Sequence, residues 1–364
     1  MKKTILLVFG GKSPEHEVSI QSARNIGLAL DKNIFDLVLI GISAEGSWYR
    51  FPDLEAIKNL KTLSDKSLPS EAQACALIPE KGRPVLLDLI QHKTLPVDCA
   101  FPITHGTFGE DGCLQGFFQI LNIPFVGCDV LSSSISMNKE FMKKIFAKDE
   151  IPTARYIALR SNEKLDFDTI QKELGLPFFI KPASMGSSVG VHKIKSKNDF
   201  DLKIKDAFLY DHTVLAEELV HGREIECSVL GSRWEAKASI CGELIPQHEF
   251  YSYEAKYLDE NGAVLKIPAE ISSDIQMRLQ NLALKVFKSM NCEGLARVDF
   301  FVNEKGDIKV NELNTLPGFT KISMYPMMWG ASGLGYTPLI TRLIELAMEK
   351  FRKDRSLKTS FLKL

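Results

Sequence analysis

Four polar residues near the C-terminal end are spaced so that they could hold a metal ion beside a phosphate group. Arg297 and Asp299 alternate along one expected strand, and Glu312 and Asn314 alternate along the next. Side chains two residues apart point to the same face of a strand. If the intervening turn is centred at 305–306, Asp299 pairs with Glu312 and Arg297 pairs with Asn314.

Facing carboxylates need a positive partner, because like charges opposite one another on a sheet repel. Carboxylate oxygens with an amide beside them suit Mg²⁺, which also keeps substrate phosphate oxygens in its coordination shell. Arg297 would then lie near those phosphates and could stabilise negative charge that develops there. A polar hairpin face with a salt-bridged arginine is the open alternative.

A second group of residues could bind the phosphates of a nucleotide. The segment Gly186-Ser187-Ser188-Val189-Gly190 follows an expected strand that contains Lys181. In such a loop backbone N–H groups can approach a phosphate closely, and a lysine supplies countercharge. Lys139 is a second candidate. A plain turn and a surface lysine remain the alternatives.

The two common glycine motifs for nucleotides are absent. Residues 10–13 (GGKS) look like the end of a P-loop, but position 6 is leucine where that pattern requires glycine, and no GxGxxG occurs. A nucleotide site must therefore be built differently. Glu217 and Glu218 end an apolar strand, where one of them could accept a hydrogen bond from an adenine amino group; a solvated strand end is the alternative. Glu224 could likewise meet a ribose hydroxyl.

Two loops in the N-terminal part carry residues that could face a small zwitterionic substrate. Glu15 and His16 follow the first expected strand, and His105 opens a glycine-rich segment. A single histidine is more often structural, so neither loop alone identifies a site.

The expected elements place these residues in loops that follow strands. An apolar strand at 5–9, a helix at 18–30 and a strand at 35–42 predict a doubly wound first domain, in which loops after strands carry ligand sites. Residues 53–84 are expected to form an irregular insertion. The later predictions are a strand at 97–102, a helix at 132–149 before a boundary at 151–152, strands at 177–182 and 214–220, a long loop at 250–267, a helix at 272–290, and strands at 295–302 and 308–314.

Composition narrows the class of protein. At roughly 100–200 residues per domain, 364 residues predict two or three domains. Lys plus Arg (45) nearly balances Asp plus Glu (46), so we expect neither a nucleic-acid nor a membrane partner, and we interpret the basic C-terminal cluster as a solvated helix end. Seven cysteines without a CxxC motif favour neither a disulfide framework nor a zinc site, and they fit a reduced, cytoplasmic setting.

Taken together, these segments resemble the D-alanine:D-alanine ligase family of the ATP-grasp superfamily. The similarity runs from residue 8 to about residue 324, and the joint pattern is far more specific than any of its parts. The matching segments are residues 10–19 (GGKSPEHEVS), 105–116 (HGTFGEDGCLQG), 136–139 (SMNK), 181–182 (KP) with 186–190 (GSSVG), 253–257 (YEAKY), 297–299 (RVD) and 311–318 (NELNTLPG).

The resemblance implies an α/β fold that is α+β in its ATP-grasp part. It implies an N-terminal substrate-binding domain over 1–130, a central ATP-grasp subdomain over 131–216, and a C-terminal ATP-grasp subdomain over 217–364. It also implies ligation of two D-alanine molecules for peptidoglycan precursor synthesis. ATP would phosphorylate the carboxylate of one D-alanine, and the amine of the second would attack the acyl phosphate.

The resemblance further implies a role for each matching residue, and a homodimer, although the sequence carries no interface signature. Glu15, near His105, would bind the ammonium of the first D-alanine, and Ser187 and Tyr257 would link to Glu15 and close the long loop over the site. The remaining implied roles are Lys139, Lys181 and Lys256 for ATP phosphates, Glu217 for adenine, Glu224 for ribose, Asp299, Glu312 and Asn314 for two Mg²⁺ (or Mn²⁺), Arg297 and the Gly318 amide for the oxyanion, and Ser323 and the Met324 amide for the second substrate's carboxylate.

Two other functions compete with this one. The nearer is a D-alanine:D-lactate ligase or another ATP-grasp ligase that joins a carboxylate to an amine. Tyr257 resembles the dipeptide-forming members, whereas hydroxy-acid enzymes tend to carry phenylalanine there. The more distant alternative, a non-catalytic nucleotide-binding regulator, would not need Arg297 together with all three candidate metal ligands.

Overall fold

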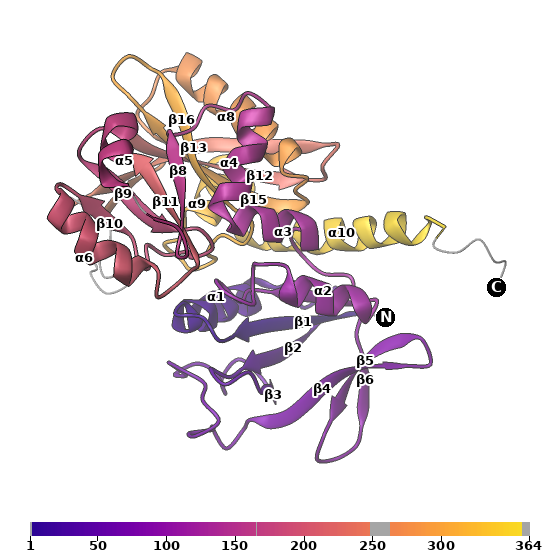
Figure 1. The fold of residues 1–364 in the computed structure, drawn as a ribbon. Coiled ribbons are helices and arrows are strands. Elements are labelled where there is room, and N and C mark those ends of the chain that lie inside the picture. Colours follow the sequence, from indigo (N-terminus) through magenta and orange to yellow (C-terminus); the bar gives the residue numbers. More distant parts are fainter. Residues whose placement is uncertain (1, 165, 248–262, 359–364) are drawn as a thin grey trace.

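The computed structural model describes residues 2–164, 166–247 and 263–358, and three β-sheets organise them (Figure 1). The first sheet has seven strands in the order β6-β5-β4-β3-β2-β1-β7, in which β1 pairs in parallel with β2 and β7 and the other pairs are antiparallel. Its strands are β1 (Lys3–Gly10), β2 (Phe35–Ile42), β3 (Trp48–Phe51), β4 (Gln73–Glu80), β5 (Arg83–Asp88), β6 (Thr94–Pro96) and β7 (Cys99–Pro102).

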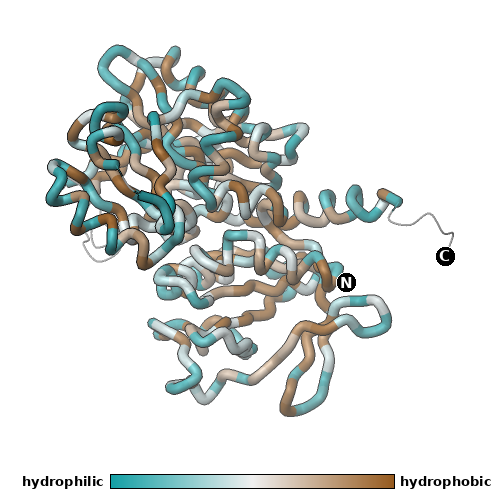
Figure 2. Tube along the Cα trace, in the orientation of Figure 1, coloured by the Kyte–Doolittle hydropathy of each residue, from teal (hydrophilic) through white to brown (hydrophobic). Residues whose placement is uncertain are grey.

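Helices cover both faces of the parallel part of this sheet, as the continuous apolar run in β1 predicts. On one face Leu7 and Phe9 pack with α1 (His16–Ala29). On the other face Leu6 and Val8 pack with α2 (Cys113–Ile120). Figure 2 shows the hydrophobic residues running along these strands, with hydrophilic residues in the surrounding loops.

The last helix among the described residues, α10 (Tyr336–Arg355), completes the core of the first domain. Its buried residues Leu339, Ile340 and Leu343 belong to the same apolar cluster as β1 and α1. Figure 1 shows α10 running between the first sheet and the other two. The first domain therefore shares its core with a helix that lies outside residues 1–130.

The other two sheets are antiparallel, which confirms the predicted α+β character of this part. The second sheet has the order β10-β9-β11-β8 and packs against α5 (Phe167–Leu174) and α6 (Lys197–Ala207). The third has the order β14-β13-β12-β15-β16 and packs against α8 (Ser273–Ser289). Their strands are β8 (Tyr156–Arg160), β9 (Phe178–Pro182), β10 (His192–Ile194), β11 (Thr213–Glu218), β12 (Arg223–Gly231), β13 (Ala236–Pro246), β14 (Ala263–Lys266), β15 (Gly294–Val302) and β16 (Ile308–Asn314).

The single helix predicted at 132–149 is wrong, because the chain forms two helices there. They are α3 (Val130–Met137) and α4 (Lys139–Lys148), and Asn138 between them has an extended backbone. The Asn138 side chain accepts hydrogen bonds from the N–H groups of Glu140 and Phe141, as an N-cap residue does. This break places Lys139 at the first position of α4.

The irregular insertion predicted at 53–84 is also wrong in its last third. There β4 and β5 form a hairpin, and Cys75 and Leu77 point into the core while their neighbours are more exposed. The connection is Lys81 and Gly82, both with positive φ, which is the two-residue turn that matches the twist of a hairpin. The part of the predicted 250–267 loop that is described contains β14, and residues 248–262 lie outside the described residues.

Among the described residues, no helix is both long enough and apolar enough to cross a membrane. All seven cysteines are free, and every one except Cys113 is buried.

The Lys81-Gly82 turn gives a prediction about stability. Gly82→Ala should destabilise the protein by about 1 kcal/mol, because an alanine there must adopt a left-handed backbone (φ 77°) although no atom blocks its methyl group. Gly330→Ala is the matched control, since its methyl group also enters open space but at a position inside helix α9 (Met324–Ala331) without positive φ. Urea denaturation should show a lower midpoint for Gly82→Ala alone, and equal midpoints would contradict the turn.

Candidate active site

The β15–β16 hairpin brings together the four residues that the sequence singled out. Asp299 pairs with Glu312 and Arg297 with Asn314, which confirms the predicted register. The turn itself lies half a residue from the predicted centre, because Val302 pairs with Ile308. An extra residue in β16, between the partners of Asp299 and Phe300, shifts the register by one and restores the predicted pairs.

The arginine in this hairpin is held between two acids. Arg297 donates two hydrogen bonds of 2.7 Å to Asp299 and lies 2.9 Å from Glu226, which is opposite Asp299 on β12. Burial acts to lower the pKa of Arg297, but the Asp299 and Glu226 carboxylates raise it well above its usual value. Asn314 also donates to Asp299, at 3.0 Å. The salt-bridged arginine considered as an alternative is therefore present, alongside the carboxylate pair.

These residues satisfy part of what a magnesium site needs. Asp299, Glu312 and Asn314 present two carboxylates and an amide on adjacent strands, and hard oxygen donors of this kind are what Mg²⁺ prefers. Among the described residues no cluster of three or more His, Cys, Asp or Glu side chains suits a metal ion. A site here would therefore depend on the asparagine and on phosphate oxygens of a substrate.

The Gly/Ser loop after β9 has a backbone suited to an anion. Ser187 and Ser188 both have positive φ (50° and 60°), which is rare for residues other than glycine and is common where function requires it. Successive residues in such turns can direct their N–H groups to one side and form an anion-binding concavity. The Lys139 side chain donates to the Met185 carbonyl at the start of this loop. The loop and Lys139 are therefore neighbours, as the sequence predicted.

Lys181 and Glu217 lie on adjacent strands of the second sheet and contact each other at 2.8 Å. A second lysine, Lys143, lies with its Nζ atom 3.4 Å from a Glu217 oxygen. Burial acts to raise the pKa of Glu217, but Lys181 and Lys143 outweigh it and lower that pKa to about 2. Burial acts to lower the pKa of Lys181, but Glu217 raises it, with smaller contributions from Glu312 and Glu224. Acids of the third sheet therefore lie near the lysine of the second.

Three loops meet at the carboxylate of Glu15. Ser187 donates a hydrogen bond of 2.5 Å to one oxygen. A methyl group added at Gly106 would lie 2.9 Å from the other oxygen, and one at Gly186 would lie 3.7 Å away. The loop after β1, the glycine-rich loop after β7 and the Gly/Ser loop thus converge, although they are far apart in the sequence. Lys256 and Tyr257 lie outside the described residues.

Both candidate histidines are buried and bonded to the protein. His16 donates from Nδ1 to the Gly11 carbonyl at 2.6 Å and accepts the Leu63 N–H at Nε2 at 2.9 Å, so its role is structural. The ring of His105 lies 3.1 Å from the Leu316 carbonyl and 3.4 Å from the Ser22 hydroxyl. Burial lowers the pKa of His105, which favours the neutral ring.

The contacts of His105 anchor the segment that carries Gly318. The Leu316 carbonyl can only accept, so Nδ1 of His105 donates to it, and Nε2 accepts from Ser22. The Ser22 oxygen in turn accepts the Phe319 N–H at 3.3 Å. The first domain therefore holds both sides of Gly318, which fixes the direction of the backbone there.

Gly318, Ser323 and Met324 lie next to one another. A methyl group added at Gly318 would be 2.8 Å from the Ser323 oxygen. Ser323 precedes helix α9, and Met324 is its first residue. The first amides of a helix lack partners within it and attract anions, so this end could receive a substrate carboxylate.

Sequence reasoning missed two residues beside the site. Glu110 accepts the Gly106 N–H at 2.6 Å, and burial together with the Glu15 carboxylate raises its pKa to about 8. The sequence signal that could have indicated Glu110 is its place in the glycine-flanked segment 109–112 (GEDG). Lys143 carried no signal, because a lysine four residues into a helix looks like a surface residue, whereas its side chain is 1% exposed.

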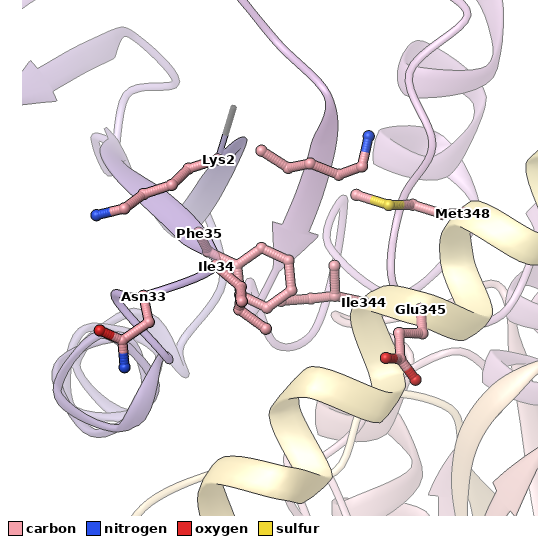
Figure 3. Close-up of a pocket in the computed structure, with 8 residues that line it drawn as sticks. Lys2, Asn33, Ile34, Phe35, Ile344, Glu345 and Met348 are labelled. Atoms are coloured by element: carbon pink, nitrogen blue, oxygen red, sulfur yellow. The ribbon is translucent and has the colours of Figure 1, made fainter.

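The pocket in Figure 3 lies elsewhere. It has a volume of about 620 Å³ and is lined by Lys2, Lys3, Asn33, Ile34, Phe35, Ile344, Glu345 and Met348. These residues surround the amino ends of β1 and β2 and the side of α10. The Glu15 loop follows the carboxyl end of β1, whereas the pocket lies at the amino ends of the parallel strands β1 and β2. The pocket is therefore separate from the three loops that meet at Glu15.

Two antiparallel sheets that bring lysines and carboxylates together are what the ATP-grasp class requires. Family models described as "D-ala D-ala ligase N-terminus" and "D-ala D-ala ligase C-terminus" match residues 4–128 and 145–345. A D-alanine–D-alanine ligase of Shouchella clausii (strain KSM-K16) is 49% identical over 362 residues, which cover 99% of this chain and 98% of the relative. The chain therefore belongs to the D-alanine–D-alanine ligase family.

Solved structures agree with this assignment. The structure of the D-alanine–D-alanine ligase from Coxiella burnetii has a TM-score of 0.86 and 35% identity, and the match covers 98% of this chain and 96% of that one. The VanG D-Ala:D-Ser ligase from Enterococcus faecalis has a TM-score of 0.84 and 34% identity, covering 95% and 100% of the two chains.

The contact between Ser187 and Glu15 gives a prediction about activity. Ser187→Ala should lower kcat/KM for D-alanine by about tenfold to a hundredfold, since a hydrogen bond to a charged group contributes roughly 1.5–3 kcal/mol. Ser161→Ala is the control, because that serine is exposed on the same subdomain. Steady-state kinetics at saturating ATP measures the effect, and equal values for the two variants would exclude a role for the contact.

Proposed function

We propose that this protein uses ATP to join two D-alanine molecules into D-alanyl-D-alanine for peptidoglycan precursor synthesis. Family membership over almost the whole chain supports the reaction. The observation that carries the proposal for the site is the 2.5 Å contact between Glu15 and Ser187, because it joins a candidate ammonium-binding carboxylate to the candidate phosphate loop. A substrate held at Glu15 would lie next to the phosphates of the nucleotide.

The chemistry explains why these groups are needed together. A carboxylate is a poor electrophile, so ATP transfers its γ-phosphoryl group to a carboxylate oxygen of the first D-alanine, releasing ADP. The neutral amine of the second D-alanine attacks this acyl phosphate, loses a proton, and displaces phosphate through a tetrahedral intermediate. Positioning and neutralisation of charge supply most of the catalysis in such a reaction.

The proposed roles come from the family resemblance, and the geometry of the described residues supports them. Glu15 accepts a hydrogen bond from the ammonium group of the first D-alanine, and His105 lies close to Glu15. The negative oxygen of the tetrahedral intermediate is met by Arg297 and the Gly318 amide, and the carboxylate of the second substrate by Ser323 and the Met324 amide. By the family resemblance, Tyr257, which lies outside the described residues, would complete the hydrogen-bonded group with Ser187 and Glu15.

The nucleotide lies between the second and third sheets in this proposal. Lys139, Lys181 and Lys256 contact its phosphates, Glu217 accepts from the adenine amino group, and Glu224 contacts the ribose. The proximity of Lys181 to Glu217, Glu224 and Glu312 supports this arrangement.

Three residues of the β15–β16 hairpin are the proposed magnesium ligands. Asp299, Glu312 and Asn314 would hold two Mg²⁺, or Mn²⁺ in their place, and their oxygen donors fit such ions. Bound Mg²⁺ supplies neutralisation of the charge on the phosphates. Arg297 then keeps Asp299 in place through its two hydrogen bonds.

We also propose that the protein is a homodimer in the cytoplasm. The exposed apolar residues Phe117 and Ile120 on α2 and Leu131 on α3 support a homodimer. Seven free cysteines, most of them buried, support a reducing, cytoplasmic setting.

A product assay tests the reaction. The full-length protein with ATP, Mg²⁺ and D-alanine should release ADP and phosphate and form a product with the mass of D-alanyl-D-alanine. L-alanine should not replace D-alanine, and D-lactate or D-serine offered with D-alanine should be joined less efficiently at neutral pH. Preferential formation of the D-lactate or D-serine product would favour the alternative ligases, and nucleotide binding without turnover would favour a regulator.

The proposed magnesium role has its own test. Asp299→Asn should fold normally but lose turnover by about a hundredfold or more at moderate Mg²⁺, with partial recovery as Mg²⁺ is raised. Asp307→Asn is the matched control, because that acid lies at the exposed turn of the same hairpin. A normal rate for Asp299→Asn, accompanied only by lower thermal stability, would support a purely structural salt bridge.

A further inference from the structure

Lys143 is a buried lysine at the back of the proposed nucleotide site. It lies on α4, and its side chain is 1% exposed. Its Nζ atom is 3.4 Å from one oxygen of Glu217, donates to the Thr153 hydroxyl at 2.8 Å, and lies 5.6 Å from the centre of the Tyr156 ring. Burying a charged group is costly unless it is paired and hydrogen-bonded, so these partners are what permit a lysine here.

Glu217 therefore sits between two lysines of different exposure. One oxygen faces Lys143 and the other faces Lys181 at 2.8 Å. The Lys181 side chain is 18% exposed and is the lysine proposed to contact phosphate. If Lys181 turns toward a phosphate, the buried Lys143 still compensates the Glu217 carboxylate.

Lys143 is also tied to the third sheet. Thr153, which accepts from Lys143, donates to the Val310 carbonyl at 3.0 Å, and the Val310 N–H donates to the Pro152 carbonyl at 2.7 Å. Val310 is two residues from Glu312 on β16. One chain of contacts thus fixes Glu217 relative to the acidic hairpin.

We propose that Lys143 is a positioning residue that sets the purine preference of the enzyme by holding Glu217 as an oriented carboxylate. This inference rests on the proposed contact of Glu217 with adenine. A carboxylate can only accept hydrogen bonds, so it favours the 6-amino group of adenine and repels the 6-oxo group of inosine or guanine. Without Lys143 the carboxylate would be free to turn fully toward Lys181 or to become protonated, and a protonated acid can donate to a 6-oxo group. The low pKa of Glu217, to which Lys143 contributes, agrees with this role.

The test compares ATP with inosine triphosphate, which carries a 6-oxo group in place of the 6-amino group. Lys143→Met should lower the ratio of kcat/KM for ATP to that for inosine triphosphate by about tenfold. The KM for D-alanine should stay unchanged. Lys144→Met is the matched control, since that neighbouring lysine is 54% exposed and pairs with Glu140 at 2.8 Å; its ratio should equal that of the wild type.

A second variant guards against misfolding of the first. Thr153→Val keeps the charges of Lys143 and Glu217 but removes the hydroxyl that accepts a hydrogen bond from Lys143. It should therefore also lower the ratio of kcat/KM for ATP to that for inosine triphosphate, by a smaller amount. Equal losses with both nucleotides in Lys143→Met and Thr153→Val would mean that Lys143 only maintains structure, and would overturn the proposal.

Glu217→Gln separates failure of this inference from failure of the adenine assignment. A wild-type ratio in Glu217→Gln would remove Glu217 from the adenine site and overturn both. A lowered ratio in Glu217→Gln with a wild-type ratio in Lys143→Met would overturn the role of Lys143 alone. If Lys143 acts through Glu217, adding Lys143→Met to Glu217→Gln should leave the ratio of that variant unchanged.

Discussion

The buried acids Glu217 and Asp299 remain ionised because positive groups compensate them, and this requirement organises the rest of the structure. Burying an unpaired charge costs several kcal/mol or more, so a buried acid that stays ionised needs a partner. Glu217 is held by Lys181 and Lys143, and Asp299 by Arg297 and the Asn314 amide. The lysines and the acidic hairpin thus meet between the two antiparallel sheets, where a polyanionic nucleotide with its cations would complete the balance of charge.

The contacts that join the domains have a second role, because they also orient the groups proposed to act on the substrate. Ser187 reaches Glu15 across 172 positions of the sequence, and the contact of His105 with Leu316 spans 211. The first fixes the loop after β1 against the Gly/Ser loop after β9. The second fixes the backbone on one side of Gly318. Since α10 also packs into the first core, the first domain is held to the rest of the protein at several separate points.

The sequence by itself determined the strands and helices whose signal is local. The apolar run in β1 predicted a strand covered on both faces, and the alternation of Arg297 with Asp299 predicted one face of the hairpin. Both predictions are confirmed. The motifs, taken in order, also predicted the family, because they combine many weak local patterns. The roles of the individual site residues remain predictions.

Only the tertiary structure decided features whose energy comes from distant partners. The break at Asn138 replaces one predicted helix by two, because the asparagine caps the second helix while its amide donates to Ser184. The ring of His105 contacts Leu316 and Ser22, and the sequence predicted neither contact. Lys143 looked like a surface lysine until the fold brought Glu217 to it. A sequence reports the propensity of each segment, whereas the compensation of a buried charge depends on which segments meet.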